Sequence, residues 1–192
     1  MADVQDSPKG LNAVAAAAKQ APGRGLPPVH LWHPAHCGEI DIVIRADGVW
    51  LHEGSPIGRP ELVRLFSTVL RRDPDGFHLV TPVEKLKIKV EDTPFRAVAV
   101  QRRDGDLVFT TDVGDETVAG PDNPIRVETD PASGEPAPSV HVRRGLEARI
   151  ARPVFYELVE MAEVADGPAG PALSVRSGGV TFALGPPGAG AP

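Results

Sequence analysis

The sequence has little cysteine and few aromatic residues, and each shortage narrows the class of protein. One cysteine among 192 residues excludes an internal disulfide, and with it a disulfide-stapled secreted scaffold. An aromatic content of 5% leaves few side chains on which nucleic-acid bases could stack. We therefore expect neither a small secreted scaffold nor a protein that binds single strands by stacking.

Positive charge and long apolar runs are also scarce. The chain has 20 Lys and Arg against 26 Asp and Glu, a net charge of −6, which argues against nucleic acid because phosphate binding needs a basic face. No apolar run approaches the ~18 residues that suggest a membrane-spanning helix. These shortages predict a cytoplasmic globular protein with neither a nucleic-acid nor a membrane partner.

Glycine and proline, by contrast, are abundant, at 20 and 21 residues. They gather in breaks between patterned segments, where rigid and permissive backbone angles favour loops. The breaks predict a flexible N-terminal segment at 1–28, an α+β domain at 29–93, a β-rich domain with one helix at 94–185 and a flexible tail at 186–192. Within the first segment, Leu11–Ala18 is alanine-rich and predicts a short helix that frays or docks weakly.

The pattern between residues 38 and 93 predicts a hairpin, a helix and two strands. Strands at Ile40–Ile44 and Val49–Glu53 flank a turn at Asp47-Gly48. Arg59-Pro60-Glu61 predicts a helix start, because proline fits the first turn and an acid fits the positive end of the helix dipole. We expect this helix to end at Asp73–Gly76. The two strands that follow are Phe77–Thr81 and Leu86–Val90.

The second half predicts three strand pairs and one helix. Alternation and turn residues place these elements at Phe95–Gln101 with Leu107–Thr110, Ile125–Glu128 with Val140–Arg143, a helix at Arg152–Ala162, and Leu173–Arg176 with Val180–Leu184.

The order of hairpin, Arg-Pro helix and hairpin occurs twice, with Arg59–Phe66 aligned to Arg152–Val159. This order predicts an α+β fold of two similar small domains that arose by duplication. A unit of this size buries only a modest core, so we expect the copies to pack together, with the groove between them as the default ligand site.

A series of motifs runs in order across residues 26 to 185. The motifs are Gly38–Ile44, Asp47–Trp50, Gly54–Arg59, Leu62–Phe66, Leu79–Lys85, Val90–Phe95, Arg152–Leu158 and Ser177–Gly179. Together they resemble the bacterial family catalogued as domain of unknown function 1285. The resemblance implies a domain duplication in which the second domain is superficially like pleckstrin-homology folds. It also implies a site for a nucleotide-like ligand at the domain interface and a role in signal transduction.

Histidine recurs at every third position from His30 to His36, and Cys37 follows. Such residues can hold zinc. However, every third residue of an extended proline-rich segment faces alike without any metal, and no second cluster completes a closed site. We interpret the segment as an extended lead-in packed by Trp32, with Cys37 a small buried hydrophobe.

The loop from Thr81 to Lys85 is a candidate binding loop. Thr81 can donate a hydrogen bond, and Lys85 can neutralise a phosphate or carboxylate, with Glu84 between them. The alternative is a proline-shaped corner with solvated Glu84 and Lys85. Glu91-Asp92 suits a hard cation, but we prefer an exposed linker there.

Arg59 and Arg152 each stand at a helix start, where a cation opposes the dipole. Such placements suggest that each guanidinium is committed to a carboxylate or to a bound anion. The carboxylate alternative for Arg59 is an ion pair with Asp41 or Asp92.

Taken together, the residues and the resemblance predict a non-enzymatic module that binds a small anionic, nucleotide-like ligand in a sensing role, with no metal or cofactor. No nucleophile elbow or phosphate-binding glycine loop is found. The alternatives are a metal-assisted hydrolase or transferase using Glu84, Glu91 or Asp92, and a protein-interaction scaffold. The predicted ligand-binding residues are Arg59, Thr81, Glu84, Lys85, Asp92, Phe95 and Arg152.

Overall fold

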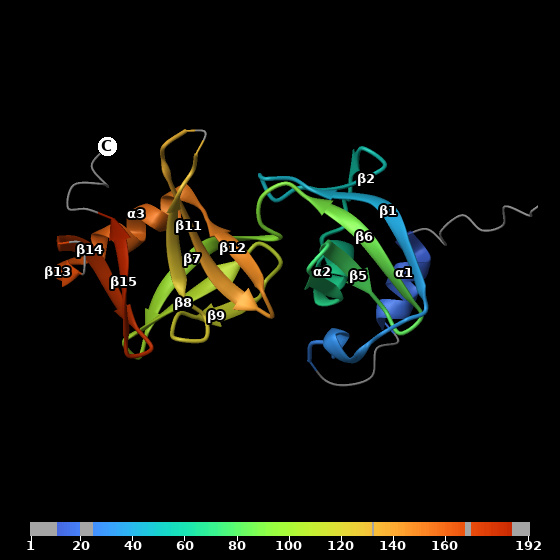
Figure 1. The fold of residues 1–192 in the computed structure, drawn as a ribbon, viewed down its shortest axis with the longest axis horizontal. Coiled ribbons are helices and arrows are strands. Elements are labelled where there is room, and N and C mark those ends of the chain that lie inside the picture. Colours follow the sequence, from blue (N-terminus) through green and yellow to red (C-terminus); the bar gives the residue numbers. More distant parts are fainter. Residues whose placement is uncertain (1–10, 20–24, 132, 168–169, 186–192) are drawn as a thin grey trace, which may run out of the picture. The chain divides into compact units, whose positions relative to one another are not determined.

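The computed structural model describes residues 11–19, 25–131, 133–167 and 170–185. The chain divides into two compact units, Met1–Asp92 and Thr93–Pro192 (Figure 1). Most of the predicted N-terminal segment before residue 25, apart from one helix, and the whole predicted tail at 186–192 lie outside the described residues.

The N-terminal unit contains a six-stranded sheet in the order β3-β2-β1-β6-β5-β4. Strands β1 to β3 form one antiparallel meander and β4 to β6 another, and β1 and β6 pair in parallel to join them. The elements are α1 (Leu11–Lys19), a 3-10 turn η1 (Val29–Leu31), β1 (His36–Ile44), β2 (Trp50–His52), β3 (Ser55–Pro56), α2 (Pro60–Thr68), β4 (Leu70–Asp73), β5 (Gly76–Val80) and β6 (Glu84–Val90).

The C-terminal unit has a second six-stranded sheet, in the order β10-β11-β12-β7-β8-β9, and a three-stranded sheet β13-β14-β15. Strands β7 and β12 again pair in parallel. The elements are β7 (Phe95–Arg103), β8 (Asp106–Thr111), β9 (Glu116–Val118), β10 (Ile125–Thr129), β11 (Pro136–Arg143), β12 (Leu146–Ile150), α3 (Arg152–Glu160), β13 (Glu163–Gly167), β14 (Gly170–Ser177) and β15 (Val180–Gly185).

The two units are similar in topology, as expected from a duplication. Numbered within its own unit, each six-stranded sheet has the strand order 3-2-1-6-5-4. The helices, however, occupy different places: α2 lies between the third and fourth strands, whereas α3 follows the sixth. The alignment of the two Arg-Pro helices was therefore wrong, since the repeated element is the curled half-barrel sheet and not the helix.

The fold is mainly β, which corrects the expected α+β class. The predicted hairpins are present, but the helix expected to run to Asp73 ends at Thr68. The hydroxyl of Thr68 donates to the carbonyl of Leu65 at 2.7 Å within the last turn, and the chain then continues as strand β4. Asp73–Gly76 is thus the turn of the β4–β5 hairpin and not a helix end.

Each sheet buries one face beneath a helix. In the N-terminal unit Phe66 of α2 is fully buried, and the side chains of Ile42 and Leu86 from the central strands are almost completely buried. Helix α1 contacts α2, and its Val14 side chain is fully buried; the expected weakness of this docking stays a prediction. In the C-terminal unit Leu158 of α3 has the corresponding buried position. In the N-terminal unit this arrangement leaves the polar side chains of β4 and β5, among them Arg71 and His78, on the opposite face of the sheet.

The Ser177-Gly178 pair fastens the β14–β15 hairpin to strand β8 and the loop after β9. The Ser177 hydroxyl accepts from the backbone N–H of Leu107 at 2.8 Å and donates to the carbonyl of Ala119 at 2.7 Å. Gly178 has φ +57°, and a Cβ there would lie 2.8 Å from the Cα of Gly120 and 2.9 Å from the oxygen of Ala119. The glycine is required by this close backbone approach.

Replacement of Gly178 by alanine should lower the free energy of unfolding by about 2–4 kcal/mol, because backbone overlap adds to the cost of a positive φ. Gly179→Ala is the matched control: its φ is +74° but a Cβ there meets nothing within 4 Å, so it should cost only about 1 kcal/mol. If chemical denaturation gave the same loss of unfolding free energy for both variants, the close approach of Gly178 to Gly120 would be contradicted.

Candidate functional site

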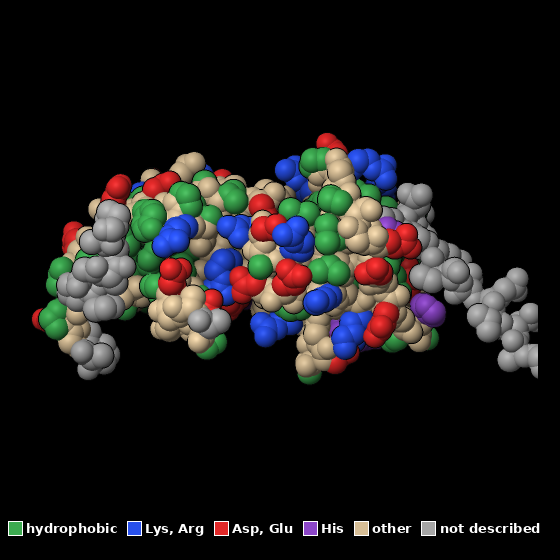
Figure 2. Space-filling view, turned by 90° about the horizontal axis from the view of Figure 1, so that it is seen from above, with side chains coloured by type: hydrophobic (Ala, Val, Ile, Leu, Met, Phe, Trp, Pro, Cys, Tyr) green, Lys and Arg blue, Asp and Glu red, His purple; other side chains and the backbone are tan. Residues whose placement is uncertain are grey.

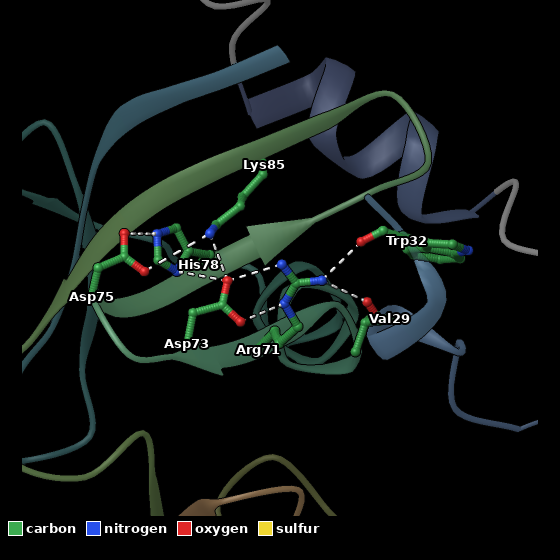
Figure 3. A network of polar contacts seen from close by, with 7 residues as sticks. All are labelled: Val29, Trp32, Arg71, Asp73, Asp75, His78 and Lys85. Carbon is green, nitrogen blue, oxygen red and sulfur yellow. Dashed lines mark hydrogen bonds and ion pairs between the residues drawn. The ribbon is translucent and has the colours of Figure 1, made fainter. Parts of the chain in front are cut away.

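A group of charged side chains lies on the outer face of the N-terminal sheet, opposite the core (Figure 3). Arg71 and Asp73 lie two residues apart on β4. His78, on β5, is the cross-strand neighbour of Arg71, and Lys85, on β6, is the cross-strand neighbour of Val80. Because side chains alternate across a strand, all four project to the same side of the sheet. We call Arg71, Asp73, Asp75, His78 and Lys85 the β4–β6 cluster.

Arg71 holds the cluster to the lead-in segment. Its Nε and Nη2 donate to the two carboxylate oxygens of Asp73 at 2.8 and 2.9 Å, a bidentate pair. Its Nη1 donates to the carbonyls of Val29 and Trp32, both at 2.9 Å. One guanidinium thus satisfies a carboxylate and two backbone acceptors, and it fixes the η1 turn beside the sheet edge.

Lys85 supplies a second cation to the same carboxylate. Its Nζ lies 2.6 Å from Oδ2 of Asp73 and 3.8 Å from Oδ1 of Asp75. Burial opposes ionisation of Asp73, but the hydrogen bonds and charges of Arg71 and Lys85 outweigh it and lower its pKa to about 2. Asp73 is therefore an anion at any neutral pH.

His78 is the most buried member of the cluster, with 3% of its side chain exposed. Burial lowers its pKa, and the charge of Lys85 acts in the same direction, against the opposing charges of Asp75 and Asp73. Its Nδ1 is buried and has no hydrogen-bond partner among the described residues. The ring is therefore held neutral beside two carboxylates.

Asp73, Asp75 and His78 offer ligand atoms that all lie within 4.8 Å of one another, close enough for the three side chains to contact one metal ion. Within the described ranges this is the one group of histidine, cysteine or acidic residues that does so. This group is not predictable from the sequence as long as Asp73–Gly76 is interpreted as a helix end and not as a hairpin turn. The available signal was the spacing Asp-x-Asp-x-x-His around a proline-glycine turn.

The predicted Thr81–Lys85 loop is a tight corner between β5 and β6. Thr81 is fully buried, and its hydroxyl accepts from the backbone N–H of Glu84 at 3.1 Å and from that of Val83 at 3.4 Å. This hydroxyl closes the corner, while Lys85 turns to the carboxylates of the β4–β6 cluster. Glu84 begins β6 and is half-buried.

Arg59 is the exposed N-cap residue of α2, and the expected ion pair with Asp41 or Asp92 is not found among the described residues. It lines a pocket of about 270 Å³ together with Lys19 from the end of α1. The other lining residues are Glu61, Leu62 and Leu65 from the first turns of α2. Two cations, neither of which pairs with a carboxylate of the described residues, thus line one small cavity.

In the C-terminal unit Arg152 is placed differently from Arg59. Arg152 is the first residue of α3, and its Nε donates to the hydroxyl oxygen of Tyr156 at 2.9 Å, with Glu135 at 3.9 Å. The hydrogen bond and partial charge of Tyr156, together with Glu135, raise the pKa of this exposed guanidinium. The ring of Phe95 is fully buried under the guanidinium of Arg143, 4.9 Å from its centroid. Phe95 is a core residue.

The carboxylates of the enzyme alternative are not gathered into a metal-binding group within the described ranges. Glu91 accepts a hydrogen bond from the backbone N–H of Ala46 at 3.1 Å, and Asp92 is exposed. His30, His33 and His36 are exposed as well. Cys37 is also exposed, so its prediction as a buried hydrophobe was wrong.

Two family models match the chain and together cover most of it. The N-terminal domain of the domain of unknown function DUF1285 matches residues 27–93, and the C-terminal domain of the protein of unknown function DUF1285 matches residues 94–184. The chain belongs to the DUF1285 family. The resemblance stated from the motifs is confirmed.

Solved DUF1285 structures agree with this membership. A DUF1285 family protein from Silicibacter pomeroyi DSS-3 is 49% identical, with a TM-score of 0.84, over 94% of this chain and 97% of that one. A second, from Shewanella baltica OS155, is 25% identical with a TM-score of 0.52, over 62% and 90%. No curated protein matches the chain.

None of the helices among the described residues is long and apolar enough to cross a bilayer. Figure 2 shows acidic and basic side chains interspersed on the face that it presents, in keeping with the mixed composition of this DUF1285 protein.

His78 should make stability depend on pH between 7 and 5. Its folded-state pKa is lowered, so the unfolded chain takes up the proton first as pH falls through about 6.5, and the free energy of unfolding should fall with it. His78→Gln should flatten this slope in denaturant titrations, whereas His33→Gln, at an exposed histidine, should not. The low pKa of Asp73 stabilises the fold above about pH 4, and this stabilisation is lost only at lower pH, so it does not add to the slope of His78. Identical slopes in all three proteins would contradict the assignment.

Proposed function

We propose that this protein is a non-enzymatic module that binds a small anionic ligand, and that the ligand binds in the pocket lined by Lys19 and Arg59. The observation that carries the proposal is that Arg59 stands at the positive end of the α2 dipole with neither Asp41 nor Asp92 as an ion-pair partner. An arginine so placed is unfavourable in the free protein and becomes favourable once an anion neutralises it.

The charges around the pocket support an anion over a cation. Lys19 and Arg59 contribute two positive charges and Glu61 one negative charge. At the start of α2, Pro60 has no N–H, and the N–H groups of Leu62 and Val63 donate to the carbonyl of Arg59. The preference for an anion therefore comes from the two side-chain cations and from the positive end of the helix dipole. Arg59 offers a planar fork for two phosphate oxygens, while Lys19 acts as a point charge.

The size and walls of the pocket limit the ligand. A volume of about 270 Å³ lies just below the usual 300–1,000 Å³ of small-molecule pockets, so a phosphate with a small organic group fits better than a large cofactor. Leu62 and Leu65 supply an apolar wall for that group. A nucleotide-like ligand, a sensing role in signal transduction, a cytoplasmic location and a pleckstrin-homology likeness of the C-terminal unit stay predictions from the resemblance and the composition.

Thermal-shift and calorimetric titrations of the full chain with inorganic phosphate and with adenosine monophosphate test the proposal. A ligand at a hundredfold over its dissociation constant should stabilise the protein by about 2.7 kcal/mol. Arg59→Ala and Lys19→Ala should each weaken binding at least tenfold, whereas Lys89→Ala, which removes a charge from an exposed position of β6, should not.

Arg59→Ala has a second readout in the absence of ligand. If the guanidinium serves an anion, its removal should leave the melting temperature unchanged or raise it, because a charge opposing the helix dipole is lost. A marked fall would show that Arg59 stabilises the fold through a protein carboxylate. That result, or binding unaffected by both pocket variants, would overturn the proposal.

A further inference from the structure

In the β4–β6 cluster, His78 places Nε2 3.3 Å from Oδ2 of Asp75 and has a backbone contact with Gly76, so the open question is its other ring nitrogen. His78 Nδ1 has no hydrogen-bond partner among the described residues, although only 3% of the side chain is exposed. Buried polar atoms almost always have a partner, because an unsatisfied one loses its hydration without compensation. The nitrogen lies 3.8 Å from Oδ2 of Asp73, so it is directed at a carboxylate and not into the apolar core.

The surroundings of this nitrogen already hold a cation between two carboxylates. The ammonium of Lys85 is 2.6 Å from Oδ2 of Asp73 and 3.8 Å from Oδ1 of Asp75 (Figure 3). Lysine is a point charge on a flexible four-carbon stem, and 21% of this side chain is exposed. It can therefore withdraw towards solvent without disturbing the hairpin.

We propose that Asp73, Asp75 and His78 form a site for a divalent transition-metal cation of the zinc type, which binds in exchange for the Lys85 ammonium. The three ligand atoms lie within 4.8 Å of one another and come from one hairpin and its turn. One imidazole nitrogen with two carboxylate oxygens suits zinc better than calcium or magnesium, which prefer oxygen alone. Water fills the remaining coordination positions.

The neighbours of the site are arranged to hold the ligands in place. Arg71 donates to both oxygens of Asp73, which orients this carboxylate as outer-shell groups orient metal ligands elsewhere. A carboxylate oxygen accepts two contacts, so Oδ2 can keep Arg71 and exchange Lys85 for the metal.

The positive charges near the site limit its affinity for a metal ion. Arg71 and Lys85 add two positive charges beside the two carboxylates, and Lys87 on β6 is the cross-strand neighbour of His78. The cation must displace one of these charges to enter. Removal of the Lys85 ammonium should therefore tighten metal binding. If Lys85 instead served only the fold or an anion, its removal would not increase the affinity for a metal ion.

Metal-free full-length protein titrated with Zn²⁺ in a calorimeter, and with Co²⁺ followed by visible absorption, tests the site. Wild type should bind one ion in the cluster. Asp75→Asn and His78→Gln should weaken this binding at least tenfold, and Lys85→Met should tighten it at least tenfold. Asp75 is 59% exposed, so Asp75→Asn keeps the test valid even if His78→Gln fails to fold.

The exposed histidines of the lead-in segment need a matched control. His33→Gln and His36→Gln should leave the affinity unchanged, since neither belongs to the cluster. Absence of zinc binding, binding that survives Asp75→Asn, or binding that Lys85→Met does not tighten would overturn the proposal. None of these variants touches Lys19 or Arg59, so failure of the metal site leaves the phosphate test intact.

Discussion

The parallel pairing of the first and sixth strands is the constraint on which each six-stranded sheet depends. In both units all the remaining pairs of neighbouring strands in that sheet are antiparallel, and each belongs to one of two three-stranded meanders. Only the contacts of β1 with β6, and of β7 with β12, make the two meanders one sheet. Without this pair, each half would expose the edge of its innermost strand and half of a hydrophobic face.

This closure separates an apolar face from a polar one and so determines where chemistry can occur. In the N-terminal unit the buried face is covered by α2, and the outer face carries the β4–β6 cluster. Two contrasting arrangements result within one unit. Lys19 and Arg59 are cations with one carboxylate beside them at a helix start, whereas Asp73 is a carboxylate that already holds two cations.

The local elements could largely be predicted from the sequence, because they depend on short-range patterns. The hairpin from Ile40 to Glu53, the Arg-Pro helix starts and the strand pair around Asp104-Gly105 all follow from alternation and turn residues. The end of α2 could not be predicted, since Leu70 continues the apolar spacing of the helix although its strand, β4, pairs with β5. That pairing is a tertiary effect, and it outweighed local propensity.

The candidate sites show the same division. Arg59 was identified because its position opposes the helix dipole, a local argument. His78 was not, because its burial and its carboxylate neighbours exist only once β4, β5 and β6 lie side by side. The equivalence of the two units likewise lies in the order of their strands. The helix that begins at Arg59 follows the third strand of its unit, whereas the helix that begins at Arg152 follows the sixth. Sequence-level reasoning therefore finds features fixed within a few residues and misses those assembled by the sheet.

The parallel strand pair also has a consequence for the order of folding. Hairpins such as β4–β5 join residues close in the chain and form on a microsecond timescale. The pairing of His36 with Glu84 must instead close most of the N-terminal unit into a loop, and the entropy of that closure is lost before any contact rewards it. We therefore expect the two meanders of each unit to form first and the parallel seam between them to form last and to limit the folding rate.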